Sequence, residues 1–170
     1  MMSKPVYTIG HGTRKADEFL ALLKKFGIQY LLDVRSRPYS RFNPQYNKQQ
    51  LQSLLQENGI TYVFMGDTLG GRPDDPACYD VQGKISYEVL KDKPYFKEGI
   101  VRIKTALSKD LDIALMCSER KPAECHRSRL IGQVLFKDGI ELRHIDDLGA
   151  LKDQPSVMKE PGKGLPDLFE

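Results

Sequence analysis

Two cysteines, a carboxylate, a histidine and an arginine lie close together around one predicted strand-to-helix connection. A thiolate, the reactive form of cysteine, needs a positive environment. A loop that leads into a helix supplies backbone N–H groups and the positive end of the helix dipole. This density of nucleophile, acid–base and cationic side chains exceeds what a hydrophobic core needs and indicates a site. The residues are Cys117, Glu119, Cys125, His126 and Arg127.

Each of these side chains also has a plain structural interpretation. Cys117 is either a nucleophile or a buried cysteine that ends an apolar strand, and the same loop geometry binds phosphate or sulfate without thiol chemistry. His126 is an acid–base candidate or a helix-start histidine bonded to Glu119. Arg127 is the strongest anion-binding candidate, because its planar guanidinium matches phosphate or carboxylate. Anion binding is therefore the firmer expectation, with Cys117 as one candidate nucleophile.

A second group of candidates follows another predicted strand. Asp33 closes an apolar run and is either a general base or the partner that holds Arg35 or Arg127 in place. Arg35 and Arg37 are close in sequence and can hold an anion, although surface arginines are usually just solvated.

Three further residues complete the set of candidates. His11 follows the first predicted strand and is an acid–base group, a ligand, or a local hydrogen-bonding residue. Gly70 and Gly71 allow a substrate to approach the backbone, but a tight turn explains them equally well.

The spacings do not match the common metal and cofactor motifs. Cys117, Cys125 and His126 do not form a paired Cys-x-x-Cys knuckle, and a structural zinc site needs four ligands. The sequence Gly-His-Gly at residues 10–12 lacks the third glycine of a dinucleotide-binding loop. Residue 123 is alanine, where a phosphate-loop phosphatase has arginine. We therefore expect no metal and no cofactor.

Composition describes an ordinary globular chain. Its 170 residues suit one domain, 40% of them are hydrophobic, and the net charge of +3 is too small to indicate nucleic acid by itself. No apolar run reaches membrane-spanning length, and the N-terminus lacks the apolar segment of a secretory signal. Three cysteines, an odd number, favour reduced thiols over a disulfide framework. These features predict a cytoplasmic protein with no membrane partner.

Alternating apolar runs and helical patterns position the candidate residues. They predict a three-layer α/β sandwich, with a mostly parallel sheet of about five strands and helices on both faces. Residues 1–150 form the single domain, and residues 151–170, which are less hydrophobic and contain three prolines, form a loosely ordered tail. The predicted strands are residues 6–10, 30–34, 60–65, 111–116 and 141–145.

Polar or glycine-rich groups follow four of these strands. In open α/β sheets, ligands bind outside the carboxyl ends of the strands. His11, Asp33 with Arg35, the Gly70-Gly71 pair and Cys117 with Glu119 are therefore expected to line one pocket. The prediction requires those strands to be neighbours in the sheet.

The motifs together resemble domain-of-unknown-function family 488. The matching stretches are residues 7–11, 33–40, 69–72, 116–119 and 125–127. They extend over most of residues 6–146. The resemblance implies an enzyme site but names no activity. The residues it implies are Asp33, Arg35, Cys117, Glu119, Cys125, His126 and Arg127.

A looser similarity to rhodanese-like domains rests on Asp-Val-Arg after an early strand and a cysteine between a strand and a helix. The loop after Cys117 differs from theirs in length and composition, so sulfur transfer is only an analogy.

Two functional hypotheses follow. The first is an enzyme that acts on a small-molecule or nucleotide-like anionic substrate. The residues expected to bind this substrate include Arg35, Arg37, Arg127 and Cys125. The second is a non-catalytic nucleic-acid-associated or DNA-repair accessory module that binds phosphates through its arginines. The last residues, Leu-Pro-Asp-Leu-Phe-Glu, resemble part of a clamp-docking peptide that would recruit a partner protein, but a self-packed terminus explains them as well.

Overall fold

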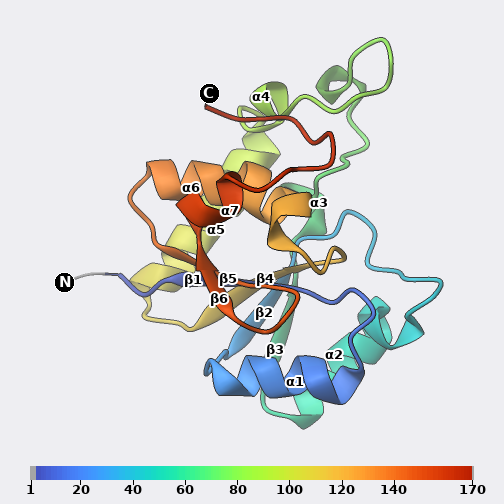
Figure 1. Ribbon diagram of the computed structural model, residues 1–170, viewed down its shortest axis with the longest axis vertical. Helices are drawn as coiled ribbons and strands as arrows, with labels where there is room; N and C mark the ends of the chain where they lie inside the picture. Colours follow the sequence, from blue (N-terminus) through green and yellow to red (C-terminus); the bar gives the residue numbers. More distant parts are fainter. Residues whose placement is uncertain (1–2, 170) are drawn as a thin grey trace.

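The computed structural model describes residues 3–169, which form one sheet covered by helices (Figure 1). The sheet has the strand order β3-β2-β4-β1-β5-β6. All neighbouring pairs are parallel except β5 with β6. The strands are β1 (Val6–Gly10), β2 (Tyr30–Asp33), β3 (Thr61–Phe64), β4 (Ile113–Cys117), β5 (Leu142–Ile145) and β6 (Leu151–Asp153).

The central strand β4 shows why the sheet is buried on both faces. Its five residues are all buried. Because successive side chains point to opposite faces, Ile113, Leu115 and Cys117 join one hydrophobic cluster, whereas Ala114 and Met116 join the other. A strand of this kind requires a helical layer on each side.

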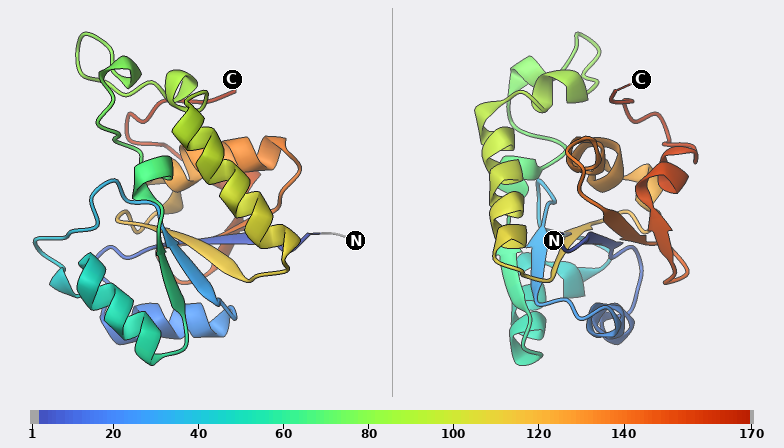
Figure 2. Two further views of the ribbon diagram at one scale, coloured as in Figure 1. Left: turned by 180° about the vertical axis from the view of Figure 1, so that it is seen from behind. Right: turned by 90° about the vertical axis from the view of Figure 1, so that its left-hand side faces the viewer.

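Helices provide those two layers (Figure 2). Residues of α1 and α2 pack in the cluster with Ala114, and residues of α5 and α6 pack in the cluster with Cys117. The longer helices are α1 (Ala16–Lys25), α2 (Lys48–Glu57) and α5 (Pro94–Ser108), and the shorter ones are α3 (Gly66–Leu69), α4 (Tyr87–Leu90), α6 (Gln133–Lys137) and α7 (Gln154–Met158). The predicted α/β sandwich with a mostly parallel sheet is confirmed.

The segment after Cys117 differs from the single helix that the sequence suggests. A short 3-10 turn, η3 (Pro122–Glu124), is followed by the π-helical turn η4 (Arg127–Gly132), which continues into α6. Cys125 lies between η3 and η4 and is extended. The second cysteine therefore precedes the helix instead of opening it.

The chain after residue 150 is part of the same fold. β6 pairs with β5, and α7 buries Gln154 and Val157. Leu168 is 1% exposed within the cluster that contains Cys117. The sequence predicted a loose tail, and the structure instead shows a strand, a helix and a buried anchor. Within the predicted docking peptide, Leu168 is buried against the domain, whereas Asp167 and Phe169 are exposed, and Glu170 lies outside the described residues.

Among residues 3–169, no helix combines the length and the apolar character needed to cross a membrane.

Candidate functional site

The strand order brings the predicted site residues to one edge of the sheet. β4 lies between β2 and β1, so the carboxyl ends of these three strands are adjacent. In the register, Gly10 is opposite Cys117 and Asp33 is opposite Met116. The neighbouring strands that the sequence argument required are therefore present.

A cavity of about 450 Å³ opens at this edge. Its wall includes groups from the ends of β2 and β4, the glycine loop after α3 and the start of the helix that leads into α6. Asp33, Arg127, Cys125, His11 and Gly70 support this wall from behind and do not line it. The lining residues are Arg35, Ser36, Arg37, Gly71, Arg72, Asp74, Tyr79, Cys117, Ser118, Glu119 and His126.

Asp33 holds Arg35 in place beneath this cavity. Its Oδ1 accepts from Arg35 Nε at 2.9 Å, and its Oδ2 accepts from Arg35 Nη2 at 2.8 Å. Tyr62 donates its hydroxyl to Oδ2 at 2.6 Å, and burial together with this carboxylate raises the pKa of Tyr62. The Asp33 side chain is 0% exposed and its two oxygens are already occupied. The geometry therefore favours the holding role over that of a general base.

His11 lies behind Arg35. Its Nδ1 donates to the Gly12 carbonyl at 2.9 Å, so Nε2 is the unprotonated nitrogen that faces Arg35 Nη1 at 3.4 Å. The ring stacks on Tyr46, with centroids 4.5 Å apart. Burial lowers the pKa of His11 to about 4, which leaves the ring neutral at pH 7.

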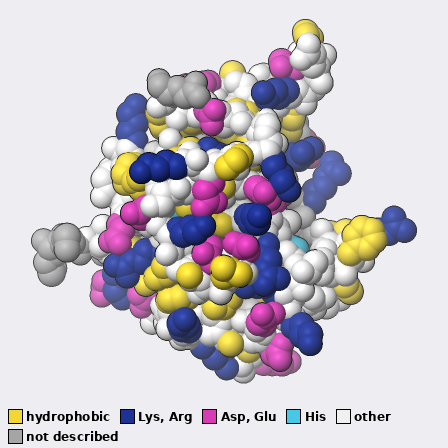
Figure 3. All heavy atoms as spheres, viewed as in Figure 1, with side chains coloured by type: hydrophobic (Ala, Val, Ile, Leu, Met, Phe, Trp, Pro, Cys, Tyr) yellow, Lys and Arg dark blue, Asp and Glu magenta, His cyan; other side chains and the backbone are white. Residues whose placement is uncertain are grey.

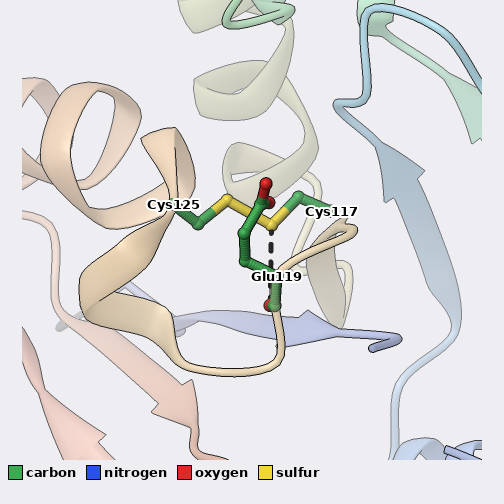
Figure 4. Close-up of side chains that lie close together, drawn as sticks. All are labelled: Cys117, Glu119 and Cys125. Atoms are coloured by element: carbon green, nitrogen blue, oxygen red, sulfur yellow. Dashed lines mark hydrogen bonds between the residues drawn. A yellow bond between two sulfur atoms is a disulfide. The ribbon is translucent and has the colours of Figure 1, made fainter. Parts of the chain in front are cut away.

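Cys117 and Cys125 form a disulfide (Figure 4). Reduced thiols were expected from the odd cysteine count, and for this pair the expectation is wrong. An odd number of cysteines argues against a framework of several disulfides, but it does not exclude one disulfide between two cysteines that are close in sequence. The loop between the end of β4 and the start of η4 turns back, so two cysteines 8 residues apart meet. The third cysteine, Cys78, is free and buried.

The two sulfurs face different surroundings. Cys117 contributes to the cavity wall, whereas Cys125 does not. The Cys125 sulfur accepts from the backbone N–H of Arg127 at 3.4 Å and lies 3.6 Å from His126 Nδ1. Both cysteines are 1% exposed, but only Cys117 borders the cavity, so it is the nearer of the two to a molecule bound there.

Arg127 supplies the positive charge next to Cys117. Its Nη1 lies 2.9 Å from Cys117 Sγ and 2.5 Å from the Glu119 carbonyl oxygen. Its Nη2 donates to the Arg120 carbonyl at 3.3 Å. The side chain is fully buried, and within residues 3–169 it forms no ion pair with a carboxylate. Burial lowers the pKa of Arg127 to about 9, so the guanidinium is still cationic at neutral pH.

A buried chain of hydrogen bonds continues from Arg127 across the sheet to α7. Arg127 Nε donates to Thr8 Oγ1 at 3.1 Å, and this hydroxyl lies 2.6 Å from His144 Nδ1. His144 Nε2 lies 2.6 Å from Gln154 Oε1, which only accepts, so Nε2 carries the proton. Gln154 in turn donates to the Ser128 carbonyl at 2.9 Å. Burial lowers the pKa of His144 to about 4.

His126 forms another part of the cavity wall. Its Nε2 donates to the Val34 carbonyl at 3.0 Å, which leaves Nδ1 unprotonated and directed toward Cys125. Burial lowers the pKa of His126. A Cβ added to Gly71 would lie 2.8 Å from the His126 ring, so this position needs glycine. Gly71 thus admits a side chain of the site, where the sequence suggested a substrate or a turn.

Glu119 is the third group at the sulfur pair. Its side chain is exposed and extends over the two sulfurs (Figure 4). One oxygen of its carboxylate and the two sulfurs lie within 4.8 Å of one another. Only the reduced form of the cysteine pair offers thiolate ligands, and a structural zinc site needs a fourth ligand in addition to these three groups.

Sequence reasoning missed several residues of this site. Tyr62, Thr8, His144 and Gln154 lie in apolar strands or in the segment regarded as a tail, and their polar atoms are joined only after folding. Arg72 was visible beside the glycine pair and lines the cavity. Arg37 also lines it, but its side chain is 87% exposed.

The comparisons with known proteins identify the family. The family model described as "Domain of unknown function DUF488" matches residues 15–135. The chain belongs to the DUF488 family. The DUF488 match contains the candidate residues at the cavity except His11, which precedes it. Neither the curated proteins nor the solved structures that were searched contain a match.

Proposed function

We propose that the protein is an enzyme that uses the reduced Cys117 thiolate to attack a small anionic substrate in the cavity. The observation that carries this proposal is the contact of 2.9 Å between Cys117 Sγ and the buried guanidinium of Arg127. A buried charge without a partner costs several kcal/mol. A thiolate at Cys117 neutralises this charge, so the site favours the nucleophilic form.

The cavity wall supports an anionic substrate. Arg35, Arg37 and Arg72 line it, against the carboxylates of Asp74 and Glu119. Arg35 is fixed by Asp33 and keeps Nη1 directed away from the carboxylate. Nη1 faces His11, so Arg35 adds positive charge to the wall, and the exposed guanidinium groups of Arg37 and Arg72 are the ones that suit contact with a carboxylate or phosphate group. Arg127 makes its contacts within the protein, so its part in this proposal is to stabilise the thiolate.

In the proposed reaction, the Cys117 sulfur forms a bond to the electrophilic atom of the substrate while the leaving group departs with its electron pair. We assign to the exposed Glu119 carboxyl, which lies next to the sulfurs, the transfer of a proton from water to that leaving group. Water or an acceptor then removes the group from Cys117. The cycle starts from the reduced form of the Cys117–Cys125 pair, and the disulfide in the structure is its oxidised form, so we propose that the protein acts in a reducing compartment, the cytoplasm.

Alkylation of the reduced protein tests the proposal. The rate at Cys117 is measured against pH by mass spectrometry of its peptide, with iodoacetamide and with the anionic reagent iodoacetate. We expect reaction well below the ordinary thiol pKa of about 8.5, and a preference for iodoacetate that weakens in Arg37→Gln. Arg102→Gln, an exposed arginine outside the cavity wall, is the matched control. A Cys117 profile identical to that of the urea-unfolded chain would overturn the proposal.

A second candidate function is supported by the loop that follows β2. Tyr39 is 68% and Phe42 is 85% exposed, and the Arg41 guanidinium lies over the Phe42 ring at 5.6 Å. Hydrophobic and basic side chains project at the right-hand edge of the molecule, where this loop lies (Figure 3). Exposed aromatic rings beside arginines can stack on bases of single-stranded nucleic acid.

Fluorescence anisotropy with a labelled single-stranded oligonucleotide tests this second function. Binding through phosphates should weaken steeply as salt is raised, should fall in the double variant Tyr39→Ala with Phe42→Ala, and should survive Cys117→Ser. Binding that is insensitive to salt or to the two aromatic substitutions would exclude it.

A further inference from the structure

We propose that Cys125 is a resolving cysteine and that the substrate of Cys117 is a small disulfide carrying negatively charged groups. This inference rests on the proposed function, because it requires Cys117 to be the attacking sulfur. It adds the identity of the electrophilic atom, the class of substrate and a catalytic role for a second cysteine.

The placement of the two sulfurs assigns their roles. They are bonded to each other, so the fold lets one sulfur reach the other. Only Cys117 lines the cavity. A substrate therefore meets Cys117, and Cys125 attacks the Cys117 sulfur from the protein side.

This arrangement selects sulfur as the electrophile. When Cys117 carries an acyl or phosphoryl group, attack by Cys125 on that group only moves it to the second cysteine. When Cys117 carries a mixed disulfide, attack by Cys125 on the Cys117 sulfur expels the substrate thiolate and leaves the bond that the structure contains.

The steps balance as thiol–disulfide exchange. The Cys117 thiolate attacks one sulfur of the substrate disulfide, and the first substrate thiolate leaves. Cys125 then attacks Cys117, the second substrate thiolate leaves, and the protein disulfide forms. The substrate is reduced by two electrons and the protein is oxidised by two. An external dithiol reduces the protein disulfide and completes the cycle.

Neighbouring groups prepare Cys125 for the second step. His126 donates Nε2–H to Val34, so its lone pair on Nδ1, 3.6 Å from Cys125 Sγ, is available for the thiol proton. The backbone N–H of Arg127 is directed to the same sulfur at 3.4 Å. His126 then passes the proton to the departing thiolate.

The arginines of the cavity specify the charge of the substrate. Arg35, Arg37 and Arg72 line the space in front of Cys117. A disulfide with carboxylate groups close to its sulfurs would place those groups against the guanidinium groups while its S–S bond faces Cys117. A cationic disulfide would meet repulsion at the same positions.

The experiment uses the reduced protein in a Cys78→Ser background and the dianionic reagent dithiobis(nitrobenzoate). We expect two equivalents of thionitrobenzoate per protein and no bound reagent, because Cys125 releases the adduct. The Cys125→Ser variant should release one equivalent and retain the mixed disulfide at Cys117 by mass spectrometry. A stable adduct on the protein that keeps both cysteines would overturn the inference and leave the proposed function standing. Reaction that persists in Cys117→Ser would overturn both.

Charge selectivity is measured by comparing this reagent with the dicationic disulfide cystamine. The ratio of the two rates is normalised to the ratio for the urea-unfolded protein. We expect the folded protein to prefer the anion by at least about tenfold, and this preference to fall in Arg37→Gln with Arg72→Gln but not in Arg102→Gln. Equal normalised rates would overturn the assignment of an anionic substrate.

Discussion

At the residue scale, several side chains for which the sequence suggests a catalytic or anion-binding role instead hold other groups of the site in position. Asp33 has the type and position of a general base, but Arg35 and Tyr62 occupy its oxygens. Arg127 has the type of an anion ligand, but its donors contact Cys117 and backbone carbonyls. Residue type and strand position identified which side chains belong to the site. Their partners depend on the packing of distant segments, which the sequence does not display.

The Asp33→Asn substitution tests this support at the residue scale. It removes the charge that pairs with buried Arg35 while keeping the shape of the side chain. We expect the free energy of unfolding to fall by about 3–5 kcal/mol, the usual effect of breaking a buried pair. Tyr62→Phe removes only one hydrogen bond to the same carboxylate and should cost about 1 kcal/mol. Urea unfolding checks both, and an Asp33→Asn protein as stable as the wild type would contradict the expectation.

The elements differ in how far the sequence predicts them. Each of the first five strands is an apolar run bounded by turn residues, so pattern alone locates it to within a few residues. β6 has only three residues and two of them are exposed, so it carries no such pattern. The π-helical turn η4 also has no sequence signal, since its residues fit an ordinary helix equally well.

At the scale of elements, we predict that helix α7 stabilises the site through Gln154. Gln154→Leu leaves the buried His144 Nε2–H and the Ser128 carbonyl without their partner. We expect a loss of about 2–3 kcal/mol in urea unfolding, with Ser156→Ala, an exposed site on the same helix, close to wild type. The His144 ring signals in an NMR spectrum should move as well. A Gln154→Leu protein of unchanged stability would show that α7 does not support the site.

At the scale of the whole molecule, buried neutral histidines make the stability depend on pH. The sequence contains three, His11, His126 and His144, and burial lowers the pKa of each. Their ordinary pKa of about 6.5 applies in the unfolded chain. Between pH 6.5 and 4 the unfolded chain therefore binds more protons than the folded protein. Stability is full above pH 6.5 and is lost as the pH falls.

Urea unfolding against pH measures this effect. For His11 and His144, with a folded pKa of about 4, we expect each to lower the free energy of unfolding by about 2 kcal/mol between pH 7 and pH 5. This range lies above most carboxylate titrations, so histidines dominate it. A His11→Asn variant should show a weaker pH dependence. A stability that is flat from pH 7 to pH 5 would contradict neutral, buried histidines.

The hydrogen-bonded chain from Arg127 through Thr8 and His144 to Gln154 has a consequence for biosynthesis. The ribosome makes the cysteines and Arg127 before it makes α7. A nascent polypeptide still attached to the ribosome thus contains both thiols but lacks Gln154, the last residue of the hydrogen-bond series that fixes the Arg127 guanidinium. The thiol environment is completed only when the C-terminal segment docks. Incomplete chains are thereby kept from acquiring the mature environment of Cys117.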